Sequence, residues 1–279
     1  MSRKSPIQPT IPLKKFEILI AYYLGRYITN PASAKPSFVA LYNGGSFLNH
    51  KEIPAPIQER IIQEIAKIKS VKEILIESRP GYVSEGKIAN LQRFLREDQT
   101  IVVGIGLECQ SDSIRKRCIN KGFGKKEYEQ AVKTLRSIGA KTLTYVLLKP
   151  PYLNEAEAIR EAIETIRYAF AAGSSLAALQ SAFVQENTLM HQLYLGGNYH
   201  PPSLWSIVEV VTQSFQYGPI HIGNLTDEPP PIAIPSNCEK CDAEIISAFQ
   251  KFNRSQDISV FRDINCSCRQ DWMEKIKSL

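Results

Sequence analysis

Short apolar runs alternate with stretches of helical periodicity along the chain. The runs are mostly apolar or β-branched and are bounded by glycine, proline or polar residues, which is typical of buried strands. They are PSFVALY, VKEILIES, QTIVVGIGLE, AKTLTYVLLK and SSLAALQSAFV. Apolar positions at helical spacing, or runs of good helix formers, predict helices over about 12–27, 54–69, 84–97, 125–138 and 154–172. Because strand and helix alternate, we expect an α/β fold with a parallel sheet and a ligand site at the carboxyl ends of its strands.

Five successive strands end in polar or glycine-rich residues. These are Gly44, Gly45 and Ser46, then Glu77 and Arg79, then Glu108, then Lys149, and then Gln185 and Glu186. Any one of them could be a structural residue with a satisfied hydrogen bond. Because the carboxyl ends of parallel strands meet at one edge of the sheet, the set predicts a binding or catalytic site.

The residue types at these strand ends suit a small charged ligand. Gly44 and Gly45 let the backbone approach a ligand without an intervening Cβ, and the carbonyl groups there could accept from an ammonium group. Glu77 or Glu108 could bind ribose hydroxyls, and the guanidinium of Arg79 suits a carboxylate. The alternative for the NGGS segment is an ordinary tight turn.

The composition is that of an ordinary folded protein. With 279 residues, 43% hydrophobic and 22% charged, the chain can form one large α/β domain with a small appendage. No apolar window approaches the length of a membrane span, and the N-terminal MSRKSPIQPT has no apolar core of the kind that a secretory signal needs. We therefore expect a cytoplasmic protein whose six cysteines are thiols or metal ligands rather than disulfides.

Positive charge is concentrated in the middle of the chain. The net charge is +6, and residues 111–150 hold ten Lys or Arg against three Asp or Glu, a local charge of +7. A segment this basic attracts phosphate groups and predicts contact with nucleic acid, for which Lys125 and Lys126 are candidates. A solvated helix face is the alternative interpretation.

Four of the six cysteines form two close pairs near the C-terminus. They are Cys238 and Cys241 in CEKC, and Cys266 and Cys268 in CSC, on either side of the helical pattern AEIISAFQKF. Two pairs of thiolates predict a tetrahedral metal site that stabilises a small appendage; we expect structural zinc, with an iron–sulfur site or free thiols as alternatives.

The segment DEPPPIAIPSN resembles a linker, so the predicted domains are 1–226 and 227–279. His191 and His221 are interpreted as ordinary polar residues.

A resemblance to a known family extends over residues 37–275. It is carried by YNGGSFLNHKEIP, IESRPGYV, VGIGLECQSDSIRKRCINKGF, YEQAVKTLRSIGAKTLTYVLLKPPYLNEAEAI and GGNYHPPSLWSIVEVV, with NKGF and KPPY as its most specific parts. These segments resemble the radical S-adenosylmethionine (SAM) superfamily. Within it they are most similar to the branch of the archaeosine synthase radical-SAM subunit and its uncharacterised bacterial relatives, with the Elongator catalytic subunit more distant.

The resemblance implies a partial (β/α)6 radical-SAM-type barrel that binds SAM, with the glycine-rich end of a strand against the methionyl amine. It also implies radical chemistry on a tRNA or a modified, 7-deazaguanine-type nucleobase, with the basic segment 111–150 contacting the tRNA. The candidate SAM-binding residues are Gly44, Gly45, Ser46, Glu77, Arg79, Glu108, Lys149 and Gln185. No catalytic residue, specific substrate or oligomeric state follows from the resemblance.

The sequence departs from the family pattern at the iron–sulfur cluster. Radical-SAM enzymes hold a [4Fe–4S] cluster with three cysteines, typically spaced CxxxCxxC, after the first barrel strand, and thiolates are the usual cluster ligands. This sequence has no cysteine before Cys109, and its predicted helix over 12–27 matches the helix that follows the cluster loop. We therefore expect the first strand and the cluster loop to be missing. Cys109 and Cys118 have the wrong spacing and are predicted to be buried structural thiols.

Two explanations of the missing cysteines remain open. In the first explanation, the sequence begins too late, and the full protein is a conventional radical-SAM enzyme whose [4Fe–4S] cluster is held by the missing segment. Alternatively, the barrel is degenerate and binds SAM, nucleic acid or a protein without radical chemistry. In this second case PSFVALY becomes an exposed apolar sheet edge to which a protein partner could bind.

Overall fold

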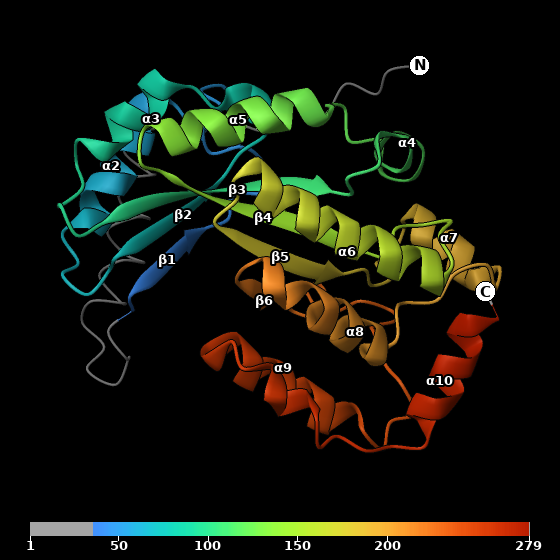
Figure 1. The fold of residues 1–279 in the computed structure, drawn as a ribbon. Helices are drawn as coiled ribbons and strands as arrows, with labels where there is room; N and C mark the ends of the chain where they lie inside the picture. Colours follow the sequence, from blue (N-terminus) through green and yellow to red (C-terminus); the bar gives the residue numbers. More distant parts are fainter. Residues whose placement is uncertain (1–35, 279) are drawn as a thin grey trace. The chain divides into compact units, whose positions relative to one another are not determined.

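The structure, a computed structural model, describes residues 36–278 and contains six strands that alternate with helices (Figure 1). The strands are β1 (Phe38–Leu41), β2 (Glu73–Glu77), β3 (Thr100–Glu108), β4 (Lys141–Leu148), β5 (Leu176–Ser181) and β6 (Ile220–Ile222). The helices are α2 (Ala55–Ala66), α3 (Glu85–Gln92), α4 (Asp112–Ile114), α5 (Lys125–Ser137), α6 (Glu155–Ala172), α7 (Leu189–Leu195), α8 (Leu204–Ser214), α9 (Asp242–Ser255) and α10 (Cys268–Lys277). A π-helical turn, η2 (Arg115–Ile119), follows α4, and a 3₁₀ turn, η4 (Ile258–Phe261), follows α9. The predicted helix over 12–27 lies outside the described residues.

The strands are ordered in space as they are in the sequence. The order is β1-β2-β3-β4-β5-β6, and the pairs β1·β2, β4·β5 and β5·β6 are parallel. Sequential parallel strands joined by helices are the topology of a (β/α) barrel sheet, so the predicted fold class is confirmed. Within the described residues β1 is an edge strand, and its Phe38 side chain is 41% exposed.

The described residues divide into two compact units. Residues 36–78 and 82–102 form the first unit, and residues 79–81 with 103–278 form the second. In the second unit the tail beyond residue 227 shares its apolar core with the helices before it, because Phe249, Phe252 and Phe261 belong to the same buried cluster as Trp205. The domain boundary at residue 227 stays a prediction.

Helix α6 shows how local sequence sets the bounds of an element. Asn154 and Glu157 form a capping box, in which the Glu157 N–H donates to Asn154 Oδ1 at 2.8 Å and the Asn154 N–H donates to Glu157 Oε2 at 2.9 Å. The helix ends at Gly173, whose φ of 106° is in the left-handed region. Its apolar side packs in the core with β4, β5 and α8.

No helix in the described part of the chain is both long and apolar enough to cross a membrane.

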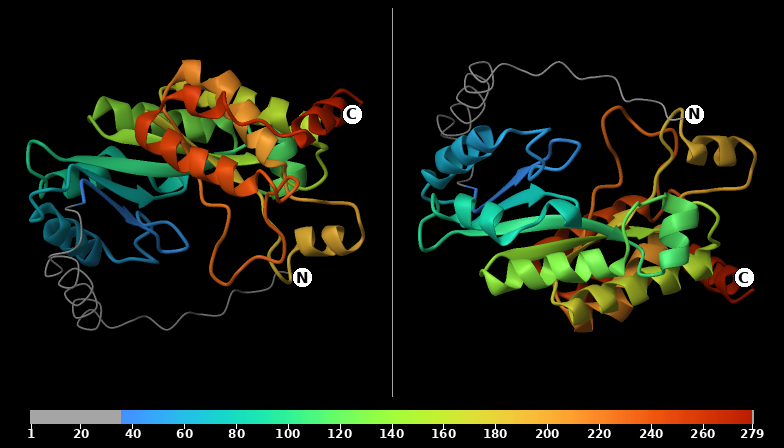
Figure 2. Two further views of the ribbon diagram at one scale, coloured as in Figure 1. Left: turned by 90° about the horizontal axis from the view of Figure 1, so that it is seen from below. Right: turned by 90° about the horizontal axis from the view of Figure 1, so that it is seen from above.

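Helix α9 and its C-cap residue cover the outer edge of β6 with two side-chain amides. Asn253 accepts from the Ile222 N–H and donates to the Ile222 carbonyl, both at 2.8 Å, and Gln256 makes the same pair of bonds to Ile220, both at 2.9 Å. The two amides therefore bond the strand groups that a further strand would otherwise pair with, which is a recognised way to protect a sheet edge. Figures 1 and 2 show α9 running beside this end of the sheet.

Removing one amide should destabilise the second unit. We expect Asn253→Ala to lower the free energy of unfolding by about 2 kcal/mol, because it leaves one N–H and one C=O of β6 without partners. Urea denaturation followed by circular dichroism measures this change. Gln250→Ala, at an exposed position of the same helix, is the matched control and should cost less than about 0.5 kcal/mol. Equal stability of the two variants would contradict the role assigned to Asn253.

Candidate functional site

The glycine-rich turn after β1 is built around the carboxylate of Glu52. Gly44 has a φ of 65°, and a Cβ added to Gly45 would lie only 2.0 Å from Glu52 Oε2. The Ser46 N–H donates to the same oxygen at 2.6 Å, and Asn49 Nδ2 donates to Oε1 at 2.7 Å. In this structure one glycine supplies the left-handed turn and the other the space for Glu52. Because the turn already contains the carboxylate of Glu52, it favours a positively charged ligand group such as an amine.

The same turn is joined to the carboxyl end of β2. The Phe47 N–H donates to the Glu77 carbonyl at 2.7 Å, and the amide of Gln58, which is buried, donates to the Phe47 carbonyl at 2.7 Å. The first unit therefore brings Gly45, Ser46 and Glu77 together, as expected for adjacent parallel strands. Their predicted role in SAM binding stays a prediction.

In the second unit, a half-buried ion pair lies on the backbone at the end of β3. Lys121 Nζ is 2.7 Å from Glu108 Oε1, and the two side chains are 24% and 17% exposed. A Cβ added to Gly106 would lie 2.4 Å from Glu108 Oε1 and 2.7 Å from Lys121 Nζ, so glycine is needed at this position. Arg79 Nη2 donates to the Lys121 carbonyl at 2.6 Å and fixes the loop that carries the lysine.

This ion pair can present a carboxylate to a ligand at a defined position. Glu108 has a φ of 66°, a conformation that costs a residue with a side chain of order 1 kcal/mol and that often marks a functional site. The ion pair uses Oε1, so the second carboxylate oxygen can accept from a hydroxyl or an amine. The strand-end prediction singled out Glu108, whereas Lys121 was missed because it lies thirteen residues further along, in a loop.

The sheet face that points away from α5, α6 and α8 carries a row of three residues. The parallel register places Tyr145, Ala178 and His221 side by side on β4, β5 and β6. Their neighbours point the other way: Thr144 bonds to α5 through the Tyr128 hydroxyl at 2.7 Å, and the alternate residues of β5 and β6 belong to the helical core.

One row further along the strands, a glutamine occupies the space above a glycine. A Cβ added to Gly223 would lie 2.1 Å from Gln180 Oε1, so the Gln180 side chain lies against this backbone. The His221 side chain is exposed, yet partial desolvation by its neighbours lowers its pKa, so the neutral imidazole, which can both donate and accept, predominates at pH 7. The short strand PIHIG, with one polar residue between two apolar ones, was the signal that could have placed His221 on this face.

Two other predicted residues are bonded locally. Lys149, with a φ of 62°, pairs with Glu155 at the start of α6, and the two side chains are only 12% and 11% exposed. The Tyr199 hydroxyl donates to the Lys149 carbonyl at 2.8 Å. Gln185 Nε2 donates to the Pro229 carbonyl at 2.7 Å. The structure thus joins Arg79 and Glu108 through Lys121, and ties Lys149 and Gln185 to neighbouring loops; the role of all four in SAM binding stays a prediction.

The four tail cysteines form a compact thiol cluster. Their Sγ atoms all lie within 4.8 Å of one another, with separations of 3.7 Å for Cys238–Cys241, 3.5 Å for Cys238–Cys266 and 3.6 Å for Cys241–Cys268. A tetrahedral ion with metal–sulfur bonds of about 2.3 Å needs sulfur–sulfur separations of about 3.8 Å. The cluster therefore fits a single tetrahedral metal ion.

The surroundings of the cluster donate hydrogen bonds to two of its sulfur atoms. Trp205 Nε1 donates to Cys268 Sγ at 3.3 Å, and Asn237 Nδ2 donates to Cys241 Sγ at 3.6 Å. Hydrogen bonds within the cluster, first from Cys268, lower the pKa of Cys238 to about 7, whereas burial raises the pKa of Cys241 and Cys268. One thiolate is thus available near neutral pH, and metal binding would release protons from the others.

The remaining cysteines do not fit a radical-SAM cluster. Cys109 is fully buried and burial raises its pKa, while Cys118 is half-buried in the η2 turn. All six cysteines of the sequence lie in the described residues, and in that part of the chain only the tail group brings three or more thiols together. The chain's own residues therefore do not provide three thiolates beside Glu108.

Comparison with known proteins identifies the family. No protein-family model matches the chain. The archaeosine synthase subunit beta of Methanosarcina acetivorans is 29% identical over 248 residues, which are 87% of this chain and 70% of the relative. The archaeosine synthase subunit beta of Thermococcus kodakarensis is 31% identical over 246 residues, which are 85% of this chain and 73% of the relative.

A solved structure shares the fold. The archaeal Methanocaldococcus infernus Elp3 with an N-terminal deletion has a TM-score of 0.60 at 15% identity, over 90% of this chain. The chain spans 60% of that Elp3 chain. The sequence relatives establish that the chain belongs to the archaeosine synthase subunit beta family, and its fold is that of the Elp3 structure.

Proposed function

We propose that this chain is a tRNA-modification subunit that binds SAM at the carboxyl edge of its sheet and acts on a 7-deazaguanine-type nucleobase. The observation that carries the proposal is the half-buried Glu108–Lys121 pair on Gly106, at a strand end where a nucleoside cofactor is expected in this family. The names of the two archaeal relatives support a role in nucleoside modification.

The second unit contains the residues that we propose hold SAM, and the carboxylate of Glu108 would accept from its ribose hydroxyls. In the first unit, considered by itself, the turn at Gly44 and Gly45 would favour an amino group, because it already holds the carboxylate of Glu52. The row of Tyr145, Ala178 and His221 lies on the sheet face of the second unit that points away from the helices, with one small side chain at its centre. SAM supplies radical chemistry only when a reduced iron–sulfur cluster is bound beside it.

The cysteine pattern limits what the chain does by itself. Because its six cysteines do not fit a radical-SAM cluster, we derive no radical step for these residues. We propose that the cluster thiolates come from protein outside these 279 residues, in a longer form of the chain or in a second chain. The same observation favours a second candidate function, a binding module for SAM, nucleic acid or a protein without radical chemistry, with the edge of β1 as a surface for a protein partner.

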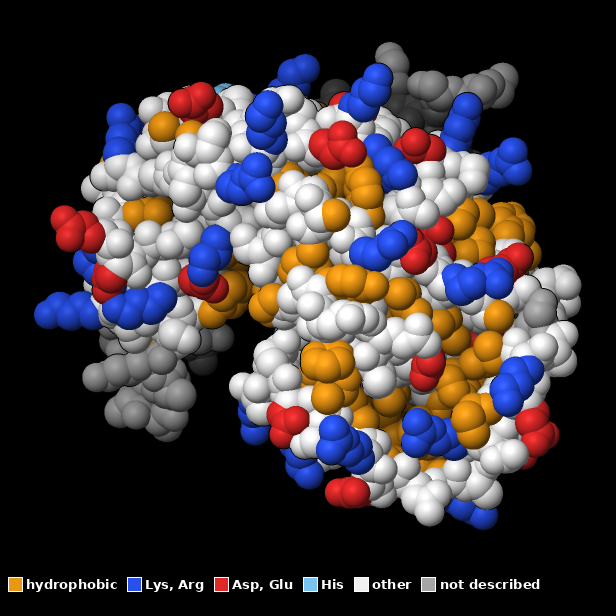
Figure 3. Space-filling model, viewed as in Figure 1, with side chains coloured by type: hydrophobic (Ala, Val, Ile, Leu, Met, Phe, Trp, Pro, Cys, Tyr) orange, Lys and Arg blue, Asp and Glu red, His pale blue; other side chains and the backbone are white. Residues whose placement is uncertain are grey.

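Helix α5 is our proposed contact for tRNA. Lys126 and Lys133 are exposed and seven residues apart, so they lie on the same side of the helix. Lys125, in contrast, donates to Gln110 Oε1 at 2.9 Å and stands over the ring of Tyr168, so it has a structural role. Figure 3 shows that Lys and Arg side chains gather over the α5 side of this face, with acidic side chains between them.

We propose that the tail cluster binds zinc with a structural role. Four thiolates in a closed tetrahedron are typical of structural zinc. Cys241 is buried against the apolar core that α8 and α9 share, so a bound ion would join the tail to the barrel helices.

The first test of the proposed function concerns this metal. Purified protein should contain one zinc ion per chain by elemental analysis. Cys241→Ser should lower the zinc content and make roughly the last 40 residues sensitive to protease, because structural zinc contributes folding free energy directly. Cys118→Ser, which changes a thiol outside the cluster, is the matched control and should keep its zinc. A preparation with neither zinc nor iron would refute the metal site.

The second test concerns SAM. Isothermal titration calorimetry should detect weak SAM binding to the 279-residue chain. Glu108→Gln should weaken it by about tenfold, the size expected for one charge-assisted hydrogen bond. Glu97→Gln, an exposed carboxylate in the first unit, should bind SAM as the wild type does. Equal affinity of the two variants would rule out Glu108 as a ligand.

The same chain should not cleave SAM. After anaerobic reconstitution with iron and sulfide and reduction by dithionite, we expect no 5′-deoxyadenosine, because three thiolates are not available beside Glu108. Addition of a segment or second chain carrying CxxxCxxC should restore the reaction. Stoichiometric 5′-deoxyadenosine from the chain alone would show that the cluster is held in another way.

The third test concerns tRNA. Lys126→Glu with Lys133→Glu should weaken tRNA binding and make it less dependent on salt, because each lost phosphate contact lowers the salt slope by about 1. The matched control is Lys251→Glu with Arg254→Glu, which changes the net charge equally at exposed positions of α9. Binding that does not depend on salt would favour a solvated helix face.

A further inference from the structure

A pocket of about 720 Å³ opens between the η2 turn, the loop after β4 and helix α6, all within the second unit. We call it the α6 pocket and define it by Arg117, Cys118, Tyr152, Arg160 and Glu161. The function proposed above does not use it. The η2 turn and the β4 loop follow the carboxyl ends of β3 and β4, so the pocket opens at the same sheet edge as Glu108.

Two arginines in the pocket wall are available to a ligand. Arg117 and Arg160 are exposed, and neither has a hydrogen-bond or ion-pair partner among the described residues. The three carboxylates of the wall already accept hydrogen bonds from the protein: Glu157 from the Asn154 N–H, Glu161 from the Ser111 N–H, and Glu164 from Arg167. The wall therefore contains carboxylates that are already engaged through one oxygen each, and two guanidinium groups without partners, which suit phosphate oxygens.

An exposed aromatic ring stands in the same wall. Tyr152 is 61% exposed although its backbone is in the left-handed region, with a φ of 74°. A large side chain held exposed in a strained conformation indicates a function outside the core. Exposed aromatic rings beside cations are the platforms on which unpaired nucleic-acid bases stack.

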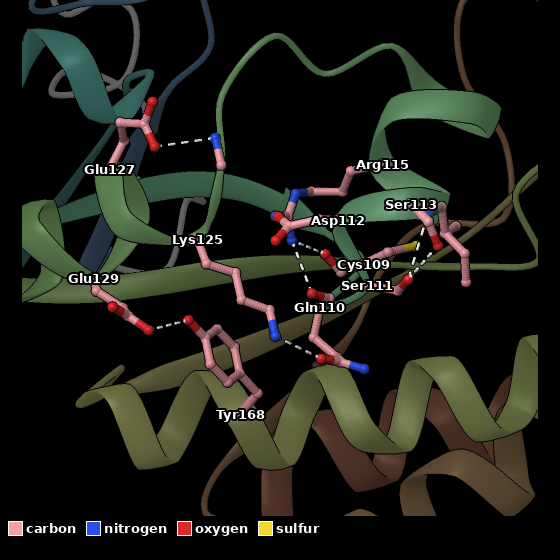
Figure 4. Close-up of polar contacts among 12 residues, drawn as sticks. Cys109, Gln110, Ser111, Asp112, Ser113, Arg115, Lys125, Glu127, Glu129 and Tyr168 are labelled. Carbon is pink, nitrogen blue, oxygen red and sulfur yellow. Dashed lines mark hydrogen bonds and ion pairs between the residues drawn. The ribbon is translucent and has the colours of Figure 1, made fainter.

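The opposite wall is held rigidly. The η2 turn is π-helical, a distortion that is frequent at functional sites, and it carries Arg117 and Cys118. Arg115, which is 2% exposed, anchors the turn by donating to the carbonyls of Cys109 at 2.6 Å and Gln110 at 3.1 Å, and it pairs with Asp112 (Figure 4). Arg117 is thus presented from a turn that is fixed before any ligand arrives.

We infer that the α6 pocket binds one unpaired nucleotide of an RNA strand, with its phosphate on Arg117 and Arg160 and its base on the ring of Tyr152. The inference rests on the proposed function for the choice of RNA, and it names a contact that the sequence and the comparisons leave open.

The experiment measures binding of a fluorescent single-stranded oligouridine of about ten nucleotides by anisotropy. Arg117→Gln with Arg160→Gln should weaken binding by about tenfold and lower its salt slope. Lys251→Gln with Arg254→Gln, two exposed cations of α9, is the control with the same charge change and should bind as the wild type does. Thermal unfolding checks that each variant is folded.

The ring is tested separately from the charge. Tyr152→Asn suits the left-handed backbone but removes the ring, and should weaken binding by about tenfold, the lower end of the range for one stacked base. Tyr152→Phe keeps the ring and should retain the affinity. If both variants bind equally well, the assignment of the base to Tyr152 is wrong.

A third readout follows occupancy of the pocket directly. Cys118 is half-buried in the wall, so saturating oligouridine should slow its alkylation by a maleimide, followed by peptide mass spectrometry. Unchanged alkylation overturns the inference, as does an arginine double variant that binds like the control. Full competition by uridine monophosphate at the affinity of the oligomer would assign the pocket to a free nucleotide instead.

The outcomes separate this inference from the proposed function. The arginine double variant should bind SAM as the wild type does, because Glu108 is unchanged. Wild-type binding of tRNA and SAM with no effect of the pocket variants would refute the α6 pocket alone. Absence of any RNA binding by the wild type would refute both.

Discussion

The parallel register of β4, β5 and β6 is the constraint on which the second unit depends. Register decides that Thr144 and Val146 face the helices, and that Tyr145 on the same strand faces the other way, in one row with Ala178 and His221. A slip by one residue would move Tyr145 into the helical core and Thr144 onto the open face. A single set of backbone hydrogen bonds therefore determines which side chains lie in the helical core and which lie on the sheet face with Tyr145, Ala178 and His221.

That register is protected at its free edge by side chains rather than by a strand. β6 has only three residues, and its outward backbone groups are bonded by Asn253 of α9 and by Gln256, which caps that helix. Helix α9 follows directly after Cys241, whose thiol lies in the four-cysteine cluster. The cluster is thus linked, through one helix, to the strand that carries His221. A metal ion bound far from Glu108 in sequence would in this way support the face on which a ligand is expected.

Much of the fold could be predicted because the signals are local. The five apolar runs became β1 to β5, and helices α2, α3, α5 and α6 lie within or close to their predicted ranges. β6 was missed because three residues with a histidine at the centre give no apolar run. The sequence also indicated a position with an unusual backbone. The glycine pair at Gly44 and Gly45 forms a turn in which Gly44 has a left-handed φ and Gly45 leaves space for Glu52.

The interactions within the site were harder to predict. Which side chains pair with one another depends on distances in the folded chain, and no local sequence pattern contains these distances. The sequence indicates that Gly45 allows a close approach, but not that the approaching group is Glu52. It places Lys149 at a strand end, yet the ammonium turns to Glu155, six residues away. Lys121 lies in the NKGF segment of the family resemblance, but no sequence pattern indicates that its ammonium pairs with Glu108 once β3 and the loop are folded together.

The residues at the ends of β3 and β4 share one physical feature, a backbone in the left-handed conformation. Glu108 and Lys149 directly follow or end their strands in the left-handed conformation, and Tyr152 adopts it three residues later. Each such residue costs of order 1 kcal/mol. Ion pairs with Lys121 and Glu155 offset this cost for the first two, whereas Tyr152 has an exposed ring and no compensating bond among the described residues. For Tyr152, where no such bond offsets the cost, our proposal of a bound RNA nucleotide supplies a reason for the conformation, and Arg117 and Arg160 in the same pocket supply the charge for its phosphate.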